Sequence, residues 1–539
     1  MAGPGRPDNP ASATRRRRFR PAAVAVAACA VLAWVPAIGA GFVSDDFVLL
    51  RAADAVESPV WPFGHNDLGE DPGAGHFYRP LWVLWNAGLL ELFGEEPAAF
   101  HTANLLLFAL IAVEVLLLAR ALLAPAGALV AGAAFALYPR HGESVAWVSG
   151  STDLLAVAVG LGALLCLLAP WPDRRRLAAA AILTAAAALA KEAAFLLPLL
   201  GGLLLAARGE RSRSGLLAGP AAMAVALIAV FAARTAVLGG LGGYGDDPVG
   251  AGRVAGAAVS YGLAALSPSQ LELLRFPVLL VVPLALAGAL AWGVWRARGG
   301  RRTVALAGLA WFALALVPVL GLPLDLNNAN GERLMLLPSV GLALALGALV
   351  PERPTREARW ALAGAAAMAA LLCLDVARNW DRAGAIAERV VAQGVALAGE
   401  GRLAVVTLPD SYRSARVFTN SYDVALRRAG ARPQAVTWCV PVHVRNEREA
   451  IGWTVVTPGA PPQVVVNTSW DAPFDFPVLR DPAPLVPGCS YAETDSGDDT
   501  APGLRLSASA TLEGAFRRAR LAYFDGRNLR MLPGLGRAE

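Results

Sequence analysis

Two adjacent aspartates, Asp45 and Asp46, follow the first apolar segment of the chain and are the first residues able to do acid–base chemistry. Adjacent carboxylates repel each other, which can raise the pKa of one of them. A carboxylate at a membrane surface could take a proton from a hydroxyl group, or hold a divalent cation that neutralises a phosphate. The simpler alternative is an acidic helix end at the interface with no catalytic role.

Two basic residues stand where they could bind a phosphate. Arg79 lies among the aromatic residues of segment 76–85, and a guanidinium can fork onto two phosphate oxygens. Lys191, the single lysine among 47 basic residues, lies at a turn between two apolar runs, which indicates a site that needs a compact ammonium. Arg234, near the end of a later run, is a further external charge whose residue type and position alone favour a structural role. The alternatives are a snorkelling arginine and a turn in which Lys191 pairs with Glu192.

Another polar group follows a later apolar run. His141 and Glu143 could ligate a divalent metal ion, Mg²⁺ or Mn²⁺, together with Asp45 or Asp46. Asp153 falls inside the next apolar run, where an ionisable residue is costly and is functional by default. Further candidates for substrate binding are His101, Glu332 and Arg333.

The elements that position these residues are apolar segments long enough to cross a membrane. Of the 539 residues, 56% are hydrophobic and 17% are charged, and the mean hydropathy is +0.49. These values exclude an ordinary soluble domain and predict about eleven transmembrane helices. The candidate spans are 21–43, 100–120, 122–138, 146–169, 177–190, 193–207, 216–238, 277–296, 303–322, 334–350 and 358–377.

Basic clusters alternate with these segments in the way that orients a membrane protein. If the arginines at 15–18 are cytoplasmic, the later arginine-rich connections return to the same side. The opposite side receives both aspartates, the four histidines that precede residue 378 and everything after about that residue. The preference for arginine over lysine, with abundant alanine, indicates a bacterial genome. We therefore predict a multi-pass protein of the bacterial cytoplasmic membrane with an extracytoplasmic site, and no nucleic-acid partner despite the net charge of +5.

The C-terminal part of the chain has a different character. Short apolar runs separated by Pro, Gly and Asp predict a small α/β domain. Cys439 and Cys489 lie there and could form a disulfide in an oxidising compartment. The expected domains are a cytoplasmic N-terminus at 1–20, a transmembrane domain at 21–378 with a first external loop at 44–99, a linker at 379–399, and the extracytoplasmic domain at 400–539.

Taken in order, several segments resemble the transmembrane and tetratricopeptide-repeat O-mannosyltransferases and their bacterial relatives. The shared order and spacing extend over residues 42–341, but no tetratricopeptide repeat is visible. Tyr138, Gly142 and Ser151 stand where that family usually has His, Thr and Arg. The matching segments are 42–46, 78–81, 101–104, 139–146, 150–155, 191–192, 332–334 and 337–341.

The resemblance implies a GT-C fold, a polyprenyl- or dolichyl-phosphate sugar donor, and a catalytic base directly after the first span. The resemblance assigns the role of catalytic base to Asp45, and Asp46 is the next candidate for the same role. The residues then expected around the donor phosphate are Arg79, Lys191 and Arg234, with His141 and Glu143 lining the same cavity.

We therefore predict a membrane glycosyltransferase, a hexosyltransferase for which mannose is one candidate sugar. It would transfer the sugar with inversion to a protein, lipid or cell-envelope glycan. One alternative is a lipid-linked glycan flippase or another polytopic transporter, which should show inverted repeats around a midplane cavity. The other alternative is a non-catalytic membrane scaffold. Loss of transfer on substitution of Asp45 or Asp46 would separate the enzyme from both.

Overall fold

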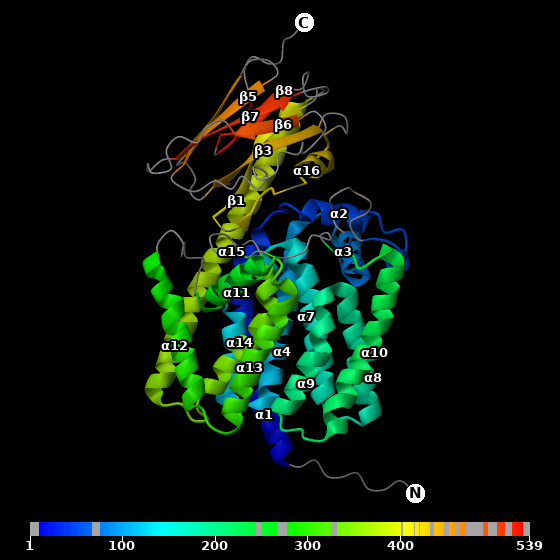
Figure 1. Ribbon diagram of the computed structural model, residues 1–539, viewed down its shortest axis with the longest axis vertical. Helices are drawn as coiled ribbons and strands as arrows, with labels where there is room; N and C mark the ends of the chain where they lie inside the picture. The colour runs from blue at the N-terminus through cyan, green and yellow to red at the C-terminus, as the bar shows by residue number, and fades with distance from the viewer. Residues whose placement is uncertain are drawn as a thin grey trace.

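The structure is a computed structural model of the 539-residue chain. It describes all residues except 1–9, 67–75, 244–249, 268–276, 323, 325–330, 400–402, 414, 420, 432–435, 447–451, 459–462, 471–488, 494–503, 513–519, 526 and 532–539. Figure 1 shows a bundle of helices below and a strand-rich region above it.

The bundle confirms the prediction of a polytopic α-helical membrane protein. Among the described residues, seven helical segments are long and apolar enough to cross a membrane. Apolar side chains such as Val24, Ile182 and Val225 are about two-thirds exposed on the outside of the bundle, as lipid-facing positions require. The seven segments contain α1 (Pro10–Trp34), α4 (Pro97–Leu122), α7 (Ser151–Leu168), α10 (Arg213–Leu238), α13 (Gly300–Leu316), α14 (Leu336–Leu349) and α15 (Arg356–Ala398).

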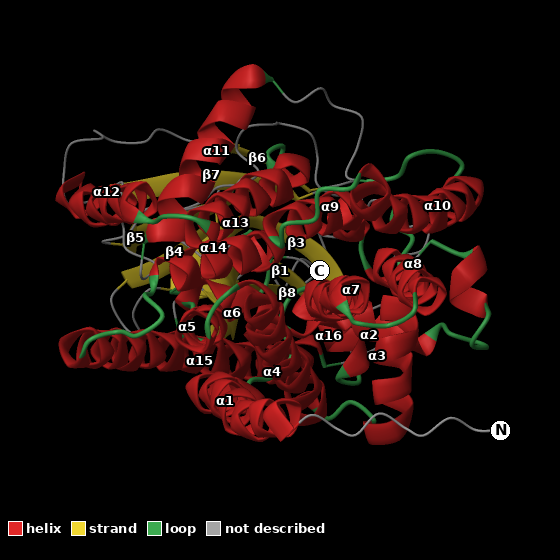
Figure 2. Cartoon of the chain, turned by 90° about the horizontal axis from the view of Figure 1, so that it is seen from below, coloured by secondary structure: helices red, strands yellow, loops and turns green. Residues whose placement is uncertain are grey.

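Shorter helices complete the bundle and its upper end, and the predicted number of crossings stays a prediction. Figure 2, which looks along the bundle from below, shows the helices packed side by side. These elements are α2 (Asp46–Asp54), α3 (Pro80–Phe93), α5 (Pro125–Ala136), η3 (Pro139–His141), α6 (Gly142–Ala146), η4 (Val148–Gly150), α8 (Asp173–Ala190), η5 (Glu192–Leu196), α9 (Leu197–Ala207), α11 (Ala251–Leu266), α12 (Val281–Arg296) and η8 (Glu332–Met335).

Helix packing depends on small residues at the crossings. A Cβ atom added to Gly341 would lie 2.4 Å from the carbonyl oxygen of Gly308, so α13 and α14 touch backbone to backbone. A Cβ on Gly347 would similarly lie 2.5 Å from the carbonyl oxygen of Gly127, where α14 crosses α5. Lipid offers no hydrophobic drive between helices, so this close van der Waals contact holds the bundle together.

Helix α15 joins the bundle to the C-terminal region. Its N-terminus is capped by Thr355, whose side chain accepts a hydrogen bond from the Ala358 N–H, and it ends at Gly399, whose φ is +49°. The expected linker at 379–399 is instead the second half of this 43-residue helix, because no proline interrupts it. Figure 1 shows α15 rising from the bundle into the strand-rich region.

The C-terminal region contains two sheets, which confirms the predicted small domain of mixed structure. In the first sheet β1 pairs in parallel with β3 and β8, and antiparallel with β2, while β8 pairs with β9. The second sheet is antiparallel in the order β4-β5-β7-β6. The predicted Cys439–Cys489 pair involves side chains outside the described part. The elements are β1 (Leu403–Tyr412), β2 (Ala415–Arg416), α16 (Tyr422–Arg428), β3 (Val436–Asn446), β4 (Gly452–Pro458), β5 (Gln463–Trp470), β6 (Cys489–Glu493), β7 (Leu504–Leu512), β8 (Arg520–Phe524) and β9 (Leu529–Met531).

The C-terminal region packs against the segment that follows α1. The Ser44 N–H donates to the Val417 carbonyl at 2.9 Å, and the Ser44 and Thr419 hydroxyls are 2.5 Å apart. The rings of Phe47 and Phe418 stack with centroids 6.1 Å apart. The two parts therefore meet directly beside the predicted catalytic aspartates.

Candidate functional site

The two adjacent aspartates occupy different environments at the start of α2. The Ser44 backbone has a φ of +46°, a turn that brings the Asp46 carboxylate back toward the preceding residues. Asp46 is 0% exposed and accepts hydrogen bonds from the Val43 N–H at 3.0 Å and from the Ser149 N–H and hydroxyl at 2.8 and 2.7 Å. Asp45 is only partly buried. Asp46 therefore joins α2 to η4, and Asp45 is the more accessible acid.

Burial raises the pKa of Asp46 to about 7. The hydrogen bonds from Val43 and Ser149 favour the carboxylate and limit the rise, while the neighbouring charge of Asp45 adds to it. Of the two adjacent acids, Asp46 therefore has the raised pKa. Burial contributes more to the rise than the charge of Asp45 does.

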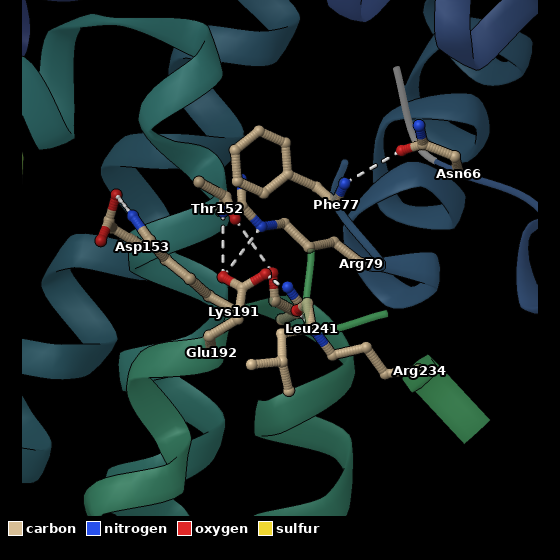
Figure 3. A network of polar contacts seen from close by, with 10 residues as sticks. Asn66, Phe77, Arg79, Thr152, Asp153, Lys191, Glu192, Arg234 and Leu241 are labelled. Atoms are coloured by element: carbon tan, nitrogen blue, oxygen red, sulfur yellow. Dashed lines mark hydrogen bonds and ion pairs between the residues drawn. The ribbon is translucent and has the colours of Figure 1, made fainter. Parts of the chain in front are cut away.

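The first charged group, which we call the Glu192 cluster, consists of Arg79, Glu192 and Arg234 (Figure 3). Arg79 immediately precedes α3 and donates to one Glu192 oxygen through Nε at 3.2 Å and Nη2 at 2.9 Å. Arg234 Nη1 donates to the other oxygen at 2.6 Å, and its Nε binds the Leu241 carbonyl. Glu192 thus holds two guanidinium groups at the upper ends of helices that are distant in sequence.

Lys191 pairs with Asp153 beside the Glu192 cluster (Figure 3). Its Nζ donates to Asp153 Oδ2 at 2.5 Å, and Asp153 lies in the first turn of α7. Burial lowers the pKa of Lys191, the Asp153 charge opposes this effect, and the charges of Arg79 and Arg333 add to it. The ammonium is therefore within electrostatic reach of a second group of charges, to which Arg333 belongs.

That second group, which we call the Glu143 cluster, consists of Glu143, Arg333 and Arg416. The Glu143 side chain is 0% exposed. It accepts from Arg333 Nη1 at 2.5 Å, from the Arg333 backbone N–H at 2.9 Å and from Arg416 Nε at 3.2 Å. Both guanidinium carbons lie over the Trp147 ring, at 5.1 and 4.9 Å from its centroid. Because Arg416 belongs to β2, the C-terminal region contributes directly to this site.

Two buried polar pairs hold the turns that carry the Glu143 cluster. Arg140 and Glu332 form an ion pair in which both side chains are fully buried. His141 Nε2 lies 2.8 Å from the Ser339 hydroxyl. A buried ion pair is costly to break, so these contacts fix the turns η3 and η8 that carry the cluster.

The donor set does not fit the predicted metal ion. Asp46 is engaged by Val43 and Ser149, His141 faces Ser339, and Glu143 is held by two arginines. Among the described residues, no three His, Cys, Asp or Glu side chains gather closely enough to ligate a metal. The prediction of Mg²⁺ or Mn²⁺ at Asp45, Asp46, His141 and Glu143 is therefore not supported.

The other predicted residues divide between the charged groups and the interior. Arg79, Lys191, Asp153 and Arg234 come together, while His101 is buried at the start of α4 and belongs to neither cluster. Glu332 serves the buried pair with Arg140.

Sequence reasoning missed Glu192 as the organising acid and Arg416 as a site residue. The position of Glu192 beside the lone lysine was an available signal. Arg416 has none, because nothing in the local sequence of the C-terminal region connects it to Glu143, 273 residues earlier.

Fold and site together define a multi-pass helical membrane protein with a charged site at one end of the bundle, closed by a C-terminal sheet region. No family model matches the sequence.

Two partial relatives are known by sequence. A stretch of 139 residues, 24% of this chain, is 40% identical to the protein O-mannosyl-transferase Tmtc2 of Drosophila melanogaster. Another, of 150 residues and 26% of the chain, is 35% identical to the protein O-mannosyl-transferase Tmtc1 of the same organism. The matches span 15% and 18% of these relatives' own lengths. They agree with the resemblance seen in the motifs.

Two solved structures show a weaker overall likeness. Arabinofuranosyltransferase AftD from Mycobacteria matches with a TM-score of 0.41 and 19% identity, over 79% of this chain and 32% of AftD. ArnT from Cupriavidus metallidurans, solved with undecaprenyl phosphate, matches with a TM-score of 0.46 and 14% identity, over 77% of this chain and 88% of ArnT.

Proposed function

We propose that the protein is a glycosyltransferase that moves a sugar from a polyprenyl-phosphate donor to a hydroxyl group of an acceptor. The observation that carries the proposal is the gathering of basic side chains at one end of an apolar bundle. A lipid-linked phosphate presents its charge at such an interface. The partial similarity to two proteins named O-mannosyl-transferases supports the same reaction class.

The donor phosphate would bind at Lys191 and the Glu192 cluster. Arg79 and Arg234 are held in fixed orientations by Glu192, so their binding to phosphate costs little side-chain entropy. Lys191 is held in the same way by Asp153. A phosphodiester bears one negative charge, which these three cations would hold at the membrane surface.

An apolar groove on the membrane part of the molecule would hold a lipid chain beside the Glu143 cluster, across the bundle from α8 and α10 at the Glu192 cluster (Figure 1). The groove has a volume of about 320 Å³ and runs between α5, α12 and α14. Its wall includes Ser339, whose hydroxyl contacts His141, so the groove adjoins one of the buried polar pairs at the Glu143 cluster. Its lining includes Phe135, Leu286, Leu290, Leu342, Leu346 and Leu349.

Asp45 is the proposed base. Asp46 is buried and already accepts three hydrogen bonds, so an acceptor hydroxyl reaches Asp45 more readily. In an inverting transfer, the Asp45 carboxylate takes the acceptor proton as the acceptor oxygen bonds to the anomeric carbon. The bond from that carbon to the phosphate oxygen breaks, and polyprenyl phosphate leaves.

The proposal also includes the kind of membrane, the kinds of acceptor and the first sugar to test. We infer a bacterial cytoplasmic membrane with the site and the C-terminal region on the extracytoplasmic face, from the distribution of arginine. The acceptor is a protein, a lipid or a cell-envelope glycan, and mannose is the first sugar to test.

The decisive experiment measures transfer of labelled sugar from a panel of polyprenyl-phosphate donors in membranes that contain the protein. Asp45→Asn should lower transfer by about 10² to 10⁴, the usual contribution of a general base. Unchanged transfer in this variant, with wild-type thermal stability, would remove the assignment of the base. Asp46→Asn is the matched comparison, because Asp46 is buried and its substitution should change the stability of the fold and its pH dependence rather than proton transfer from the acceptor. Absence of transfer from every donor would instead favour a transporter or scaffold.

A further inference from the structure

The C-terminal region brings one side chain, Arg416, into the charged site. Its Nε donates to Glu143 Oε1 at 3.2 Å and its Nη1 to the Thr419 hydroxyl at 3.4 Å. Its side chain is 12% exposed, and its guanidinium lies over Trp147. These contacts fix the plane and direction of the group before any substrate binds.

Arg416 is linked through Thr419 to the residue that precedes the proposed base. The Thr419 hydroxyl that it contacts is 2.5 Å from the hydroxyl of Ser44, the residue before Asp45. The Trp147 ring beneath Arg416 donates through Nε1 to the Val43 carbonyl at 3.4 Å. The Glu143 cluster is thus tied on two sides to the turn that carries Asp45.

Arg333 brings a second guanidinium to the same carboxylate and the same ring. It also lies within electrostatic reach of Lys191, which belongs to the proposed donor-phosphate site. Two guanidinium groups held together on one buried acid form a preorganised region of positive potential near Lys191.

We propose that Arg416 and Arg333 stabilise the second negative charge that the donor phosphate acquires when its bond to the sugar breaks. This inference rests on the proposed function. Before transfer, the phosphodiester has one negative charge. As the acceptor oxygen bonds to the anomeric carbon, the electron pair of the broken bond stays on the phosphate oxygen. Asp45 holds the acceptor proton, and the leaving polyprenyl phosphate is a monoester with two negative charges.

This role requires Arg416 to favour the monoester over the diester, because an interaction speeds a reaction only when it strengthens along the reaction path. The C-terminal region is then part of the catalytic site, since it supplies one of the two guanidinium groups.

The test compares the binding of two lipids to the purified full-length protein at pH 8. One is undecaprenyl phosphate, and the other is its methyl diester, which keeps a single charge. Arg416→Gln should lower the affinity for the monoester about tenfold, the effect of one lost charge-assisted hydrogen bond, with little change for the diester. Arg416→Lys should recover part of the loss, because it restores the charge without the planar fork.

Arg428→Gln is the matched control. Arg428 also joins the C-terminal region to the membrane part, through Asp54 and Glu95 at 2.6 Å each, but it lies outside both clusters. Its loss should leave both affinities unchanged. An equal fall for both lipids in Arg416→Gln would reduce Arg416 to a structural role and overturn the inference, as would unchanged affinity for both. If the wild-type protein binds neither lipid, the proposed function itself fails.

Discussion

The Glu192 cluster and the Glu143 cluster are built alike, each from one glutamate and two arginines, but they join different parts of the molecule. Arg79, Glu192 and Arg234 all belong to the membrane part, and the Glu192 side chain is 31% exposed. Glu143 is fully buried and bridges the membrane part to the C-terminal region. The same three charges therefore form a partly exposed group within the membrane part in one place and a junction with a buried acid in the other.

This difference follows from the cost of burying a charge. When a carboxylate that reaches solvent loses its ion-pair partner, water hydrates the charge. A buried carboxylate that loses its partner stays without hydration, which costs much more free energy. The predictions below use this contrast and run from the largest expected effect to the smallest.

Glu143→Gln should destabilise the protein by about 3 to 5 kcal/mol, because it leaves two arginines on a buried group that no longer balances their charge. Glu192→Gln should cost less, since the Glu192 side chain is partly exposed and solvent screens its charge in part. Thermal unfolding in detergent measures both. Equal destabilisation by the two variants would show that burial does not distinguish the clusters.

Asp46 is also a buried acid, but the hydrogen-bond donors that hold it, from Val43 and Ser149, are neutral groups. Its pKa in the folded protein, about 7, is above its ordinary value of 3.8, so the folded state binds the proton more tightly. Stability should therefore fall as the pH rises from about 4 to 7, by up to about 1.4 kcal/mol per pH unit, and then level off. Asp46→Asn should flatten this part of the profile of melting temperature against pH. The same slope in both proteins would assign it to other groups.

Lys191→Arg tests whether the lone lysine is needed as a compact ammonium between the clusters. The variant keeps the charge opposite Asp153 but introduces a larger planar group, so donor KM should rise about tenfold with little loss of stability. Arg176→Lys is the reciprocal control, because Arg176 pairs with the exposed Asp173 at the other end of α8. Wild-type KM in Lys191→Arg would mean that charge alone is sufficient.

Arg428→Gln should have the smallest effect, within about 1 kcal/mol, although it removes two ion pairs across the same junction as Glu143. Asp54 and Glu95 are each about half exposed, so water replaces the lost partner. A fall in melting temperature as large as that of Glu143→Gln would show that the junction depends on its rim rather than its buried acid.

Much of the site could be predicted from residue types near the ends of apolar runs. Arg79, Lys191 and Arg234 were expected at one face of the membrane, because the arginine-rich connections alternate with the segments that carry them, and the structure brings the three together around Glu192 and Asp153. The roles of Asp45 and Asp46 could not be separated in the same way. Which of two adjacent residues is buried depends on the turn at Ser44 and on the donors of Ser149, 103 residues away.

The sequence by itself determined the membrane part and the composition of its charged end, because hydropathy and charge are local properties of the chain. Only the tertiary structure decided that Glu143 binds arginines rather than a metal, and that Arg416 reaches it from the C-terminal region. Ion pairs form between side chains that folding brings within a few ångströms, and no local pattern records a partner 273 residues away.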